Sequence, residues 1–149
     1  MAQTASFLID TNILVHLMRN DDLGQWLERT YNLRATLGSS MISVVVIGEI
    51  LSLARQFHWK EKKLDELKLL VDQLVHIDIN SDDILSAYGE LDAHSRSVGR
   101  RMGKNDLWIA ATARVVNAAI LTTDKDFDHL DPTFLTRIYI DLTNYDQTA

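Results

Sequence analysis

The segment from Phe7 to Leu14 constrains the fold of this chain more than any other. Three apolar residues lead into Asp10, two small polar residues follow, and an apolar pattern resumes at Ile13. The first half is typical of a short buried strand and the second half of an amphipathic helix. Asp10 is therefore predicted at the carboxyl end of a strand, the edge of a parallel α/β sheet where ligands collect. An Asp directly before a helix is also a common N-cap, so Asp10 alone leaves both roles open.

Composition narrows the class of protein. The 149 residues predict one domain over 1–149, and 46% hydrophobic with 24% charged residues is ordinary globular composition. The absence of cysteine excludes disulfides, thiolate metal ligands and a cysteine nucleophile. The sequence shows neither a signal peptide nor a long apolar run, so we expect a cytoplasmic protein with no membrane partner. The net charge of −6 gives no overall sign of nucleic-acid binding.

Strand-like and helix-like segments alternate in the order β-α-α-β-α-α-β-α-α-β-β. Strands are predicted at 7–9, up to Ser43, at 75–79, 119–124 and 138–142. Helices are predicted from Ile13, from Asp21 with a possible extension through Leu33 and Leu37, and over 43–57, 61–75, 81–95 and 107–117. This alternation predicts an α/β fold with a mostly parallel sheet, flanked by helices and connected by right-handed crossovers.

The run Val44–Ile47 is ambiguous. Its β-branched residues favour a strand. In the alternative, Ser43 caps a helix that continues to Phe57. We prefer the helix because it places Val45, Glu49, Leu53 and Gln56 on one face.

Four acidic residues occur where a solvated surface does not explain them. Asp10 and Asp124 follow predicted strands, Asp106 opens a helix, and Glu49 lies inside an apolar helix. Each also has a plain structural alternative: a helix cap for Asp106, a turn residue for Asp124, and an exposed position for Glu49. A glutamate is almost never fully buried without a partner.

Convergence of these acids would require a cation. Two carboxylates about 4 Å apart repel by about 4 kcal/mol at an effective dielectric near 20. Mg²⁺ and Mn²⁺ prefer carboxylate and water oxygens, and such ions promote attack of water on a phosphodiester. The sequence contains no P-loop or dinucleotide-binding fingerprint, and its five histidines show no metal-ligand or catalytic-triad spacing.

Four segments together resemble the PIN-domain ribonucleases, and among them the VapC toxins of bacterial toxin–antitoxin pairs. They are residues 7–12, 43–50, 105–113 and 121–127, in the order in which that family has them. The resemblance implies a three-layer α/β/α sandwich and a helical Val44–Ile47 run. It also implies a homodimer, inhibited by a small antitoxin whose C-terminal segment enters the active-site groove.

The same resemblance implies roles for individual residues. The acidic quartet that holds Mg²⁺ or Mn²⁺ would be Asp10, Glu49, Asp106 and Asp124. The residues that orient these acids or bound water would be Thr11, Asn12 and Thr123. Asp128 is a possible contributor beside Asp124, and we interpret Asp126 as a cap for the turn at Phe127.

A basic segment precedes Asp106 and interrupts the acidic background, at Arg96, Arg100, Arg101 and Lys104. It could contact RNA phosphates beside the metal, or it could be a solvated loop.

Together, the acidic residues and the resemblance predict a metal-dependent endoribonuclease, the toxin of an antitoxin-regulated pair. The alternatives are a PIN-like module that binds RNA or protein without catalysis, and a metal phosphohydrolase of small phosphates.

Overall fold

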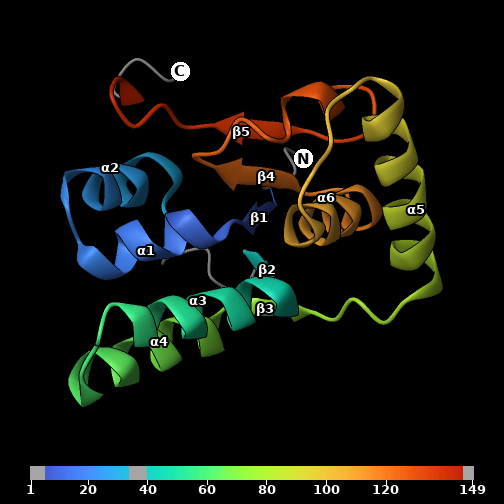
Figure 1. The fold of residues 1–149 in the computed structure, drawn as a ribbon. Coiled ribbons are helices and arrows are strands. Elements are labelled where there is room, and N and C mark those ends of the chain that lie inside the picture. Colours follow the sequence, from blue (N-terminus) through green and yellow to red (C-terminus); the bar gives the residue numbers. More distant parts are fainter. Residues whose placement is uncertain (1–5, 34–39, 146–149) are drawn as a thin grey trace, which may run out of the picture.

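The computed structural model describes residues 6–33 and 40–145 of the chain (Figure 1). The strands are β1 (Phe7–Ile9), β2 (Met41–Ser43), β3 (Val75–Ile77), β4 (Ala119–Thr122) and β5 (Arg137–Tyr139). The α-helices are α1 (Thr11–Arg19), α2 (Asp22–Tyr31), α3 (Val44–Gln56), α4 (Glu61–Gln73), α5 (Asp82–Ser97) and α6 (Lys104–Val116). A short 3₁₀ helix, η1 (Asp128–Leu130), precedes β5. The described order agrees with the predicted one.

All strand pairs are parallel, and the strand order is β3-β2-β1-β4-β5. The chain builds the sheet outward from β1 to β3 and then returns to place β4 on the other side of β1. The strand order therefore reverses at β1, and ligands bind at the carboxyl edge of such a reversal point. Asp10 directly follows β1, and Asp124 comes two residues after β4.

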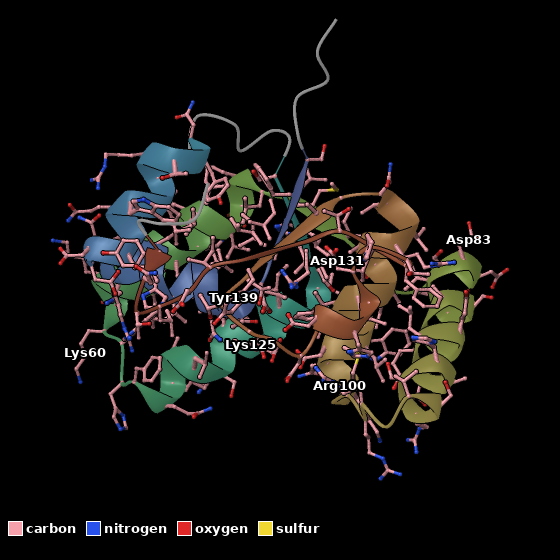
Figure 2. The ribbon with its side chains drawn as sticks, turned by 90° about the horizontal axis from the view of Figure 1, so that it is seen from above. Lys60, Asp83, Arg100, Lys125, Asp131 and Tyr139 are labelled. Atoms are coloured by element: carbon pink, nitrogen blue, oxygen red, sulfur yellow. The ribbon has the colours of Figure 1, made fainter. Side chains whose placement is uncertain are left out.

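Helices flank the sheet. Figures 1 and 2 show the strands between the α1–α2 pair and the α5–α6 pair, with α3 and α4 as a third pair. Helices α1 and α2 pack closely because Gly24 lies against the carbonyl of His16, where a Cβ would collide with it. The core includes both faces of β1, whose Leu8 and Ile9 are buried, as expected for a central parallel strand.

Local sequence explains where the helices begin and end. Asp10, Asp21, Ser43 and Ser81 cap α1, α2, α3 and α5 with side-chain hydrogen bonds. Asn20, Asn32 and Asn117 end α1, α2 and α6 in the left-handed conformation that asparagine tolerates. The structure confirms that Val44–Ile47 is helical, with Ser43 as the cap, so the strand propensity of this run does not decide its conformation.

Several predicted boundaries were wrong. Helix α2 stops at Tyr31 because Asn32 turns left-handed, so buried Leu33 lies beyond the helix. Leu37 lies outside the described residues. Strands β3, β4 and β5 end earlier than predicted, at Ile77, Thr122 and Tyr139. Among the described residues, no helix has the length and apolar character needed to cross a membrane.

Candidate active site

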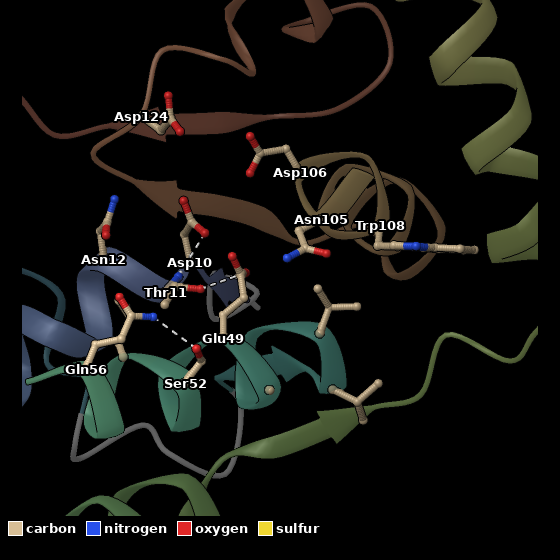
Figure 3. Close-up of a pocket in the computed structure, with 14 residues that line it drawn as sticks. Asp10, Thr11, Asn12, Glu49, Ser52, Gln56, Asn105, Asp106, Trp108 and Asp124 are labelled. Carbon is tan, nitrogen blue, oxygen red and sulfur yellow. Dashed lines mark hydrogen bonds between the residues drawn. The ribbon is translucent and has the colours of Figure 1, made fainter. Parts of the chain in front are cut away.

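A groove of about 670 Å³ opens at the carboxyl edge of the sheet, where the strand order reverses (Figure 3). Its walls come from the start of α1, one face of α3, the start of α6 and the loop after β4. All four predicted acids line it, and so do Val45, Leu53 and Gln56, which the helical prediction placed on the same face as Glu49. Residues from four distant segments therefore meet at one place.

Asp10 serves as a helix cap and a groove residue at once. Its Oδ1 accepts a hydrogen bond from the Thr11 backbone N–H at 2.8 Å, and its Oδ2 accepts one from the Thr122 hydroxyl at 2.7 Å. The side chain is only 5% exposed. Burial raises the pKa of Asp10, the two hydrogen bonds oppose that rise, and the charges of Glu49 and Asp124 add to it. The carboxylate is held in one orientation at the floor of the groove.

Glu49 reaches the groove from the second turn of α3. Its Oε1 accepts a hydrogen bond from the Thr11 hydroxyl at 3.0 Å. Thr11 is buried, so this bond ties the first turn of α1 to α3. Thr11 therefore contacts Glu49 through its hydroxyl and Asp10 through its backbone N–H.

Asp106 is a second groove carboxyl whose pKa is raised. It lies in the first turn of α6, whose N-cap is Gly103, so it is not the cap of that helix. Burial, the charges of Asp10, Asp124 and Asp126, and a hydrogen bond with the Asp126 side chain raise the pKa of Asp106 to about 7. A carboxyl group at this pKa changes its charge near neutral pH, and perturbed groups of this kind mark functional sites.

Two further carboxylates come from the loop after β4. Asp106, Asp124 and Asp126 each offer an oxygen within 4.8 Å of the others. Burial also raises the pKa of Asp124, and the Asp126 charge adds to that effect. The interpretation of Asp126 as a cap was wrong, because η1 has no side-chain cap and Asp126 faces Asp106 instead.

The hydroxyl that orients the loop belongs to Thr122. It donates to Asp10 and accepts the backbone N–H of Asp124 at 2.9 Å. Thr123, which was predicted for this role, makes no side-chain hydrogen bond within the described part of the chain. Adjacent strand residues point to opposite faces, and two consecutive threonines in the sequence do not reveal which one faces Asp10.

The donor set of the groove fits a hard divalent cation. Its candidate ligands are carboxylate oxygens, which Mg²⁺ and Mn²⁺ prefer. Asp106, Asp124 and Asp126 are close enough to share one ion, with Asp10 and Glu49 lining the same groove. A cation there would remove the repulsion that raises the pKa of Asp106.

Some of the remaining predicted residues lie at the groove, and others form ion pairs away from it. Asn12 lines the groove, and Lys104 lies beside Glu49 and Asp106 in an adjoining hollow. Arg96 instead lies in the last turn of α5 and pairs with Asp92 at 3.1 Å. Asp128 pairs with Arg137 at 2.9 Å, so it is engaged with β5.

Arg100 and Arg101 are exposed in the loop between α5 and α6.

The sequence analysis did not identify Ser52, Asn105 and Trp108, which also line the groove. The three-to-four residue spacing from Glu49 to Ser52 and Gln56 could have identified the first of these.

Comparison with known proteins agrees with this geometry. The chain matches the PIN domain family over residues 7–132. It is 28% identical over 125 residues to Ribonuclease VapC1 of Haemophilus influenzae (strain R2866), covering 83% of this chain and 91% of that protein.

Solved structures give the same result. A crystal structure of VapBC2 from Rickettsia felis, bound to a promoter DNA fragment, matches with a TM-score of 0.72 and 26% identity. This match covers 88% of this chain and 96% of that one. VapBC-1 from nontypeable Haemophilus influenzae matches with a TM-score of 0.69 and 28% identity, over 89% and 96% of the two chains. The match to the family spans most of the sequence and includes all four groove segments, so this chain belongs to the PIN domain family.

Proposed function

We propose that this protein is a metal-dependent endoribonuclease and the toxin of a type II toxin–antitoxin pair. The observation that carries the proposal is the convergence of Asp10, Glu49, Asp106 and Asp124 in one groove. A scaffold that only bound a partner would gain nothing from acids that repel one another. The relatives support the same activity, because the curated ones are named Ribonuclease VapC1 and the solved ones are VapBC complexes.

The residues have separable roles in this mechanism. Asp106, Asp124 and Asp126 would hold the divalent cation, and Asp10 and Glu49 would complete its surroundings. When bound, the cation lowers the pKa of a water molecule and stabilises charge on the leaving oxygen of the phosphodiester. We propose Mg²⁺ as the physiological ion, with Mn²⁺ as a substitute.

The protein prepares this chemistry by fixing its acids. Thr11 and Thr122 hold Asp10 and Glu49 in place, so these carboxylates need no reorientation when substrate arrives. Without a cation the pKa of Asp106 is about 7, so binding of the cation would displace its proton near neutral pH. Once a cation is bound, Asp106 stays ionised and serves as a ligand, and a carboxylate that is not a ligand would accept the proton of the attacking water.

The proposed partners follow from the relatives. A small antitoxin would inhibit the enzyme by inserting its C-terminal segment into the groove. A homodimer is our proposal for the assembly, and a cellular RNA substrate implies action in the cytoplasm.

One experiment separates this function from its alternatives. Purified protein is incubated with total cellular RNA, and in parallel with a small phosphate monoester and diester, with Mn²⁺ or with chelator. Discrete RNA fragments that require both Mn²⁺ and Asp10, with no turnover of the small phosphates, are the expected result. Turnover of the small phosphates alone would favour the phosphohydrolase, and no turnover by folded, antitoxin-free protein would favour the binding module.

A further inference from the structure

Two helices lead away from the acidic groove side by side. Thr11 at the start of α1 hydrogen-bonds Glu49 on α3. Eight residues further along both helices, the guanidinium of Arg19 lies 5.2 Å from the ring centre of Phe57. Helices α1 and α3 therefore run in the same direction, and eight residues correspond to about 12 Å along a helix.

Polar side chains of α3 line the path between these two contacts. Ser52 and Gln56 both face the groove, and Gln56 Nε2 donates a hydrogen bond to Ser52 Oγ at 3.0 Å (Figure 3). Leu53 and Asn12 complete this part of the wall. The groove therefore continues from the carboxylates toward the far end of α3.

A basic–aromatic patch lies at that far end, and we define it as Arg19, Phe57, Trp59, Lys60 and Lys63. The rings of Phe57 and Trp59 are 5.9 Å apart, and Lys63 Nζ lies 4.5 Å from the centre of the Trp59 ring. Phe57 is 41% exposed, an unusual position for a phenylalanine. Figure 2 shows Lys60 at the periphery of the molecule, beside the turn between α3 and α4.

The positive charges of this patch are only partly offset by nearby acids. Within residues 6–33 and 40–145, Arg19, Lys60 and Lys63 form no ion pair with an acid. Asp21, in the turn after α1, pairs with His16 and also interacts electrostatically with Arg19. With three cations against the nearby Asp21 and Glu61, the patch keeps a net positive charge in a chain whose net charge is −6.

We propose that the basic–aromatic patch binds the single-stranded RNA substrate beyond the cleaved bond; this inference rests on the proposed function. Cations that contact phosphates and exposed rings that stack on bases are the two components of single-strand recognition. The distance of about 12 Å along α3 from Glu49 to Phe57 corresponds to roughly three nucleotides at a stacked spacing near 3.4 Å. Figure 2 shows Arg100, which belongs to the predicted basic segment, on the opposite side of the molecule from Lys60.

Binding and cleavage are measured separately. In an Asp10→Asn background, which prevents cleavage, fluorescence anisotropy gives the affinity for a labelled oligouridylate across a salt series. Arg19→Gln/Lys63→Gln removes two patch cations. Arg29→Gln/Lys68→Gln is the control for total charge: both cations are exposed and lie outside the patch and the groove, and Lys68 pairs with Asp72. Phe57→Leu removes the ring and keeps an apolar side chain.

The proposal predicts a specific pattern. The patch double variant should flatten the slope of log affinity against log salt by about 1.4, the value for two phosphate contacts on a single strand, and the control should not. Phe57→Leu should weaken single-strand binding by roughly tenfold and leave duplex RNA binding unchanged. Thermal melting checks that each variant is folded.

If both patch variants keep the affinity and the salt slope of the Asp10→Asn protein, the patch does not bind RNA and the proposal is overturned. Equal losses in the patch and control variants would overturn it too, because only total charge would then matter. Cleavage by the otherwise unmodified chain is run beside these assays. If that chain cleaves RNA and the patch variants bind normally, the patch proposal fails and the proposed function stands.

Discussion

The hydroxyl of Thr122 lies 2.7 Å from Oδ2 of Asp10, so the end of β4 holds the carboxylate that follows β1. The same hydroxyl accepts the backbone N–H of Asp124. One buried side chain thus fixes two acids of the groove relative to each other, because strands β1 and β4 are adjacent in the sheet.

Replacing Thr122 by valine should therefore affect both the fold and the site. The change leaves a buried carboxylate oxygen without its donor, which costs about 1–3 kcal/mol of unfolding free energy. Thr122→Ser keeps the hydroxyl and should lose much less, and Thr123→Val should leave cleavage near the unmodified rate. Chemical denaturation and cleavage rates check this, and a larger effect at Thr123 than at Thr122 would contradict the orientation of β4.

The raised pKa of Asp106 predicts how the metal-free protein responds to pH. The pKa rises from 3.8 in its usual state to about 7 in the fold, so the folded protein binds this proton more tightly. Stability from this group is fully present below about pH 4, falls as pH rises toward 7, and is absent above it. Asp106→Asn should remove that part of the pH dependence and raise the melting temperature at pH 8 more than at pH 5. Melting in chelator checks this, and parallel curves for the two proteins would contradict it.

The stabilisation by a bound cation should increase with pH, because the acids must lose their protons to become ligands. Millimolar Mn²⁺ should raise the melting temperature of the unmodified chain more at pH 8 than at pH 6. The rise should be smaller in Asp10→Asn, which loses a charge in the same groove. Equal shifts in both proteins would mean that the ion binds elsewhere.

Asp126 and Asp128 offer a matched pair of tests in one loop. Asp126→Asn should weaken Mn²⁺ binding, and a tenfold loss of affinity would reduce the metal-dependent stabilisation by about 1.4 kcal/mol. Asp128→Asn removes the partner of Arg137, so it should lower stability without changing the metal effect. Thermal melting with and without Mn²⁺ distinguishes them, and the opposite result would place the ion nearer η1.

The strand-to-helix patterns predicted the order of elements and the position of Asp10, because apolar runs and capping residues are local signals. They did not predict the role of Asp126. Its approach to Asp106 depends on how the loop after β4 folds back, and two acids spaced two residues apart look the same in many turns.

The predicted end of a helix was wrong where the conformation of a single residue ended that helix. Asn32 ends α2 by its left-handed conformation, although Leu33 continues the apolar pattern and is buried. The choice between Thr122 and Thr123 depended on the register of β4, which no pattern in four residues specifies. The side-by-side course of α1 and α3 is a tertiary property and could not be predicted from either helix alone.

The central claim is that these acids form one metal-dependent centre that cuts RNA. Cleavage of total cellular RNA by the unmodified chain, Asp106→Asn and Asp128→Asn, each with Mn²⁺ or chelator, tests it most directly. We expect discrete fragments from the unmodified chain and from Asp128→Asn with Mn²⁺, and none from Asp106→Asn or in chelator. Cleavage that persists in folded Asp106→Asn, or that is unaffected by chelator, would contradict the account.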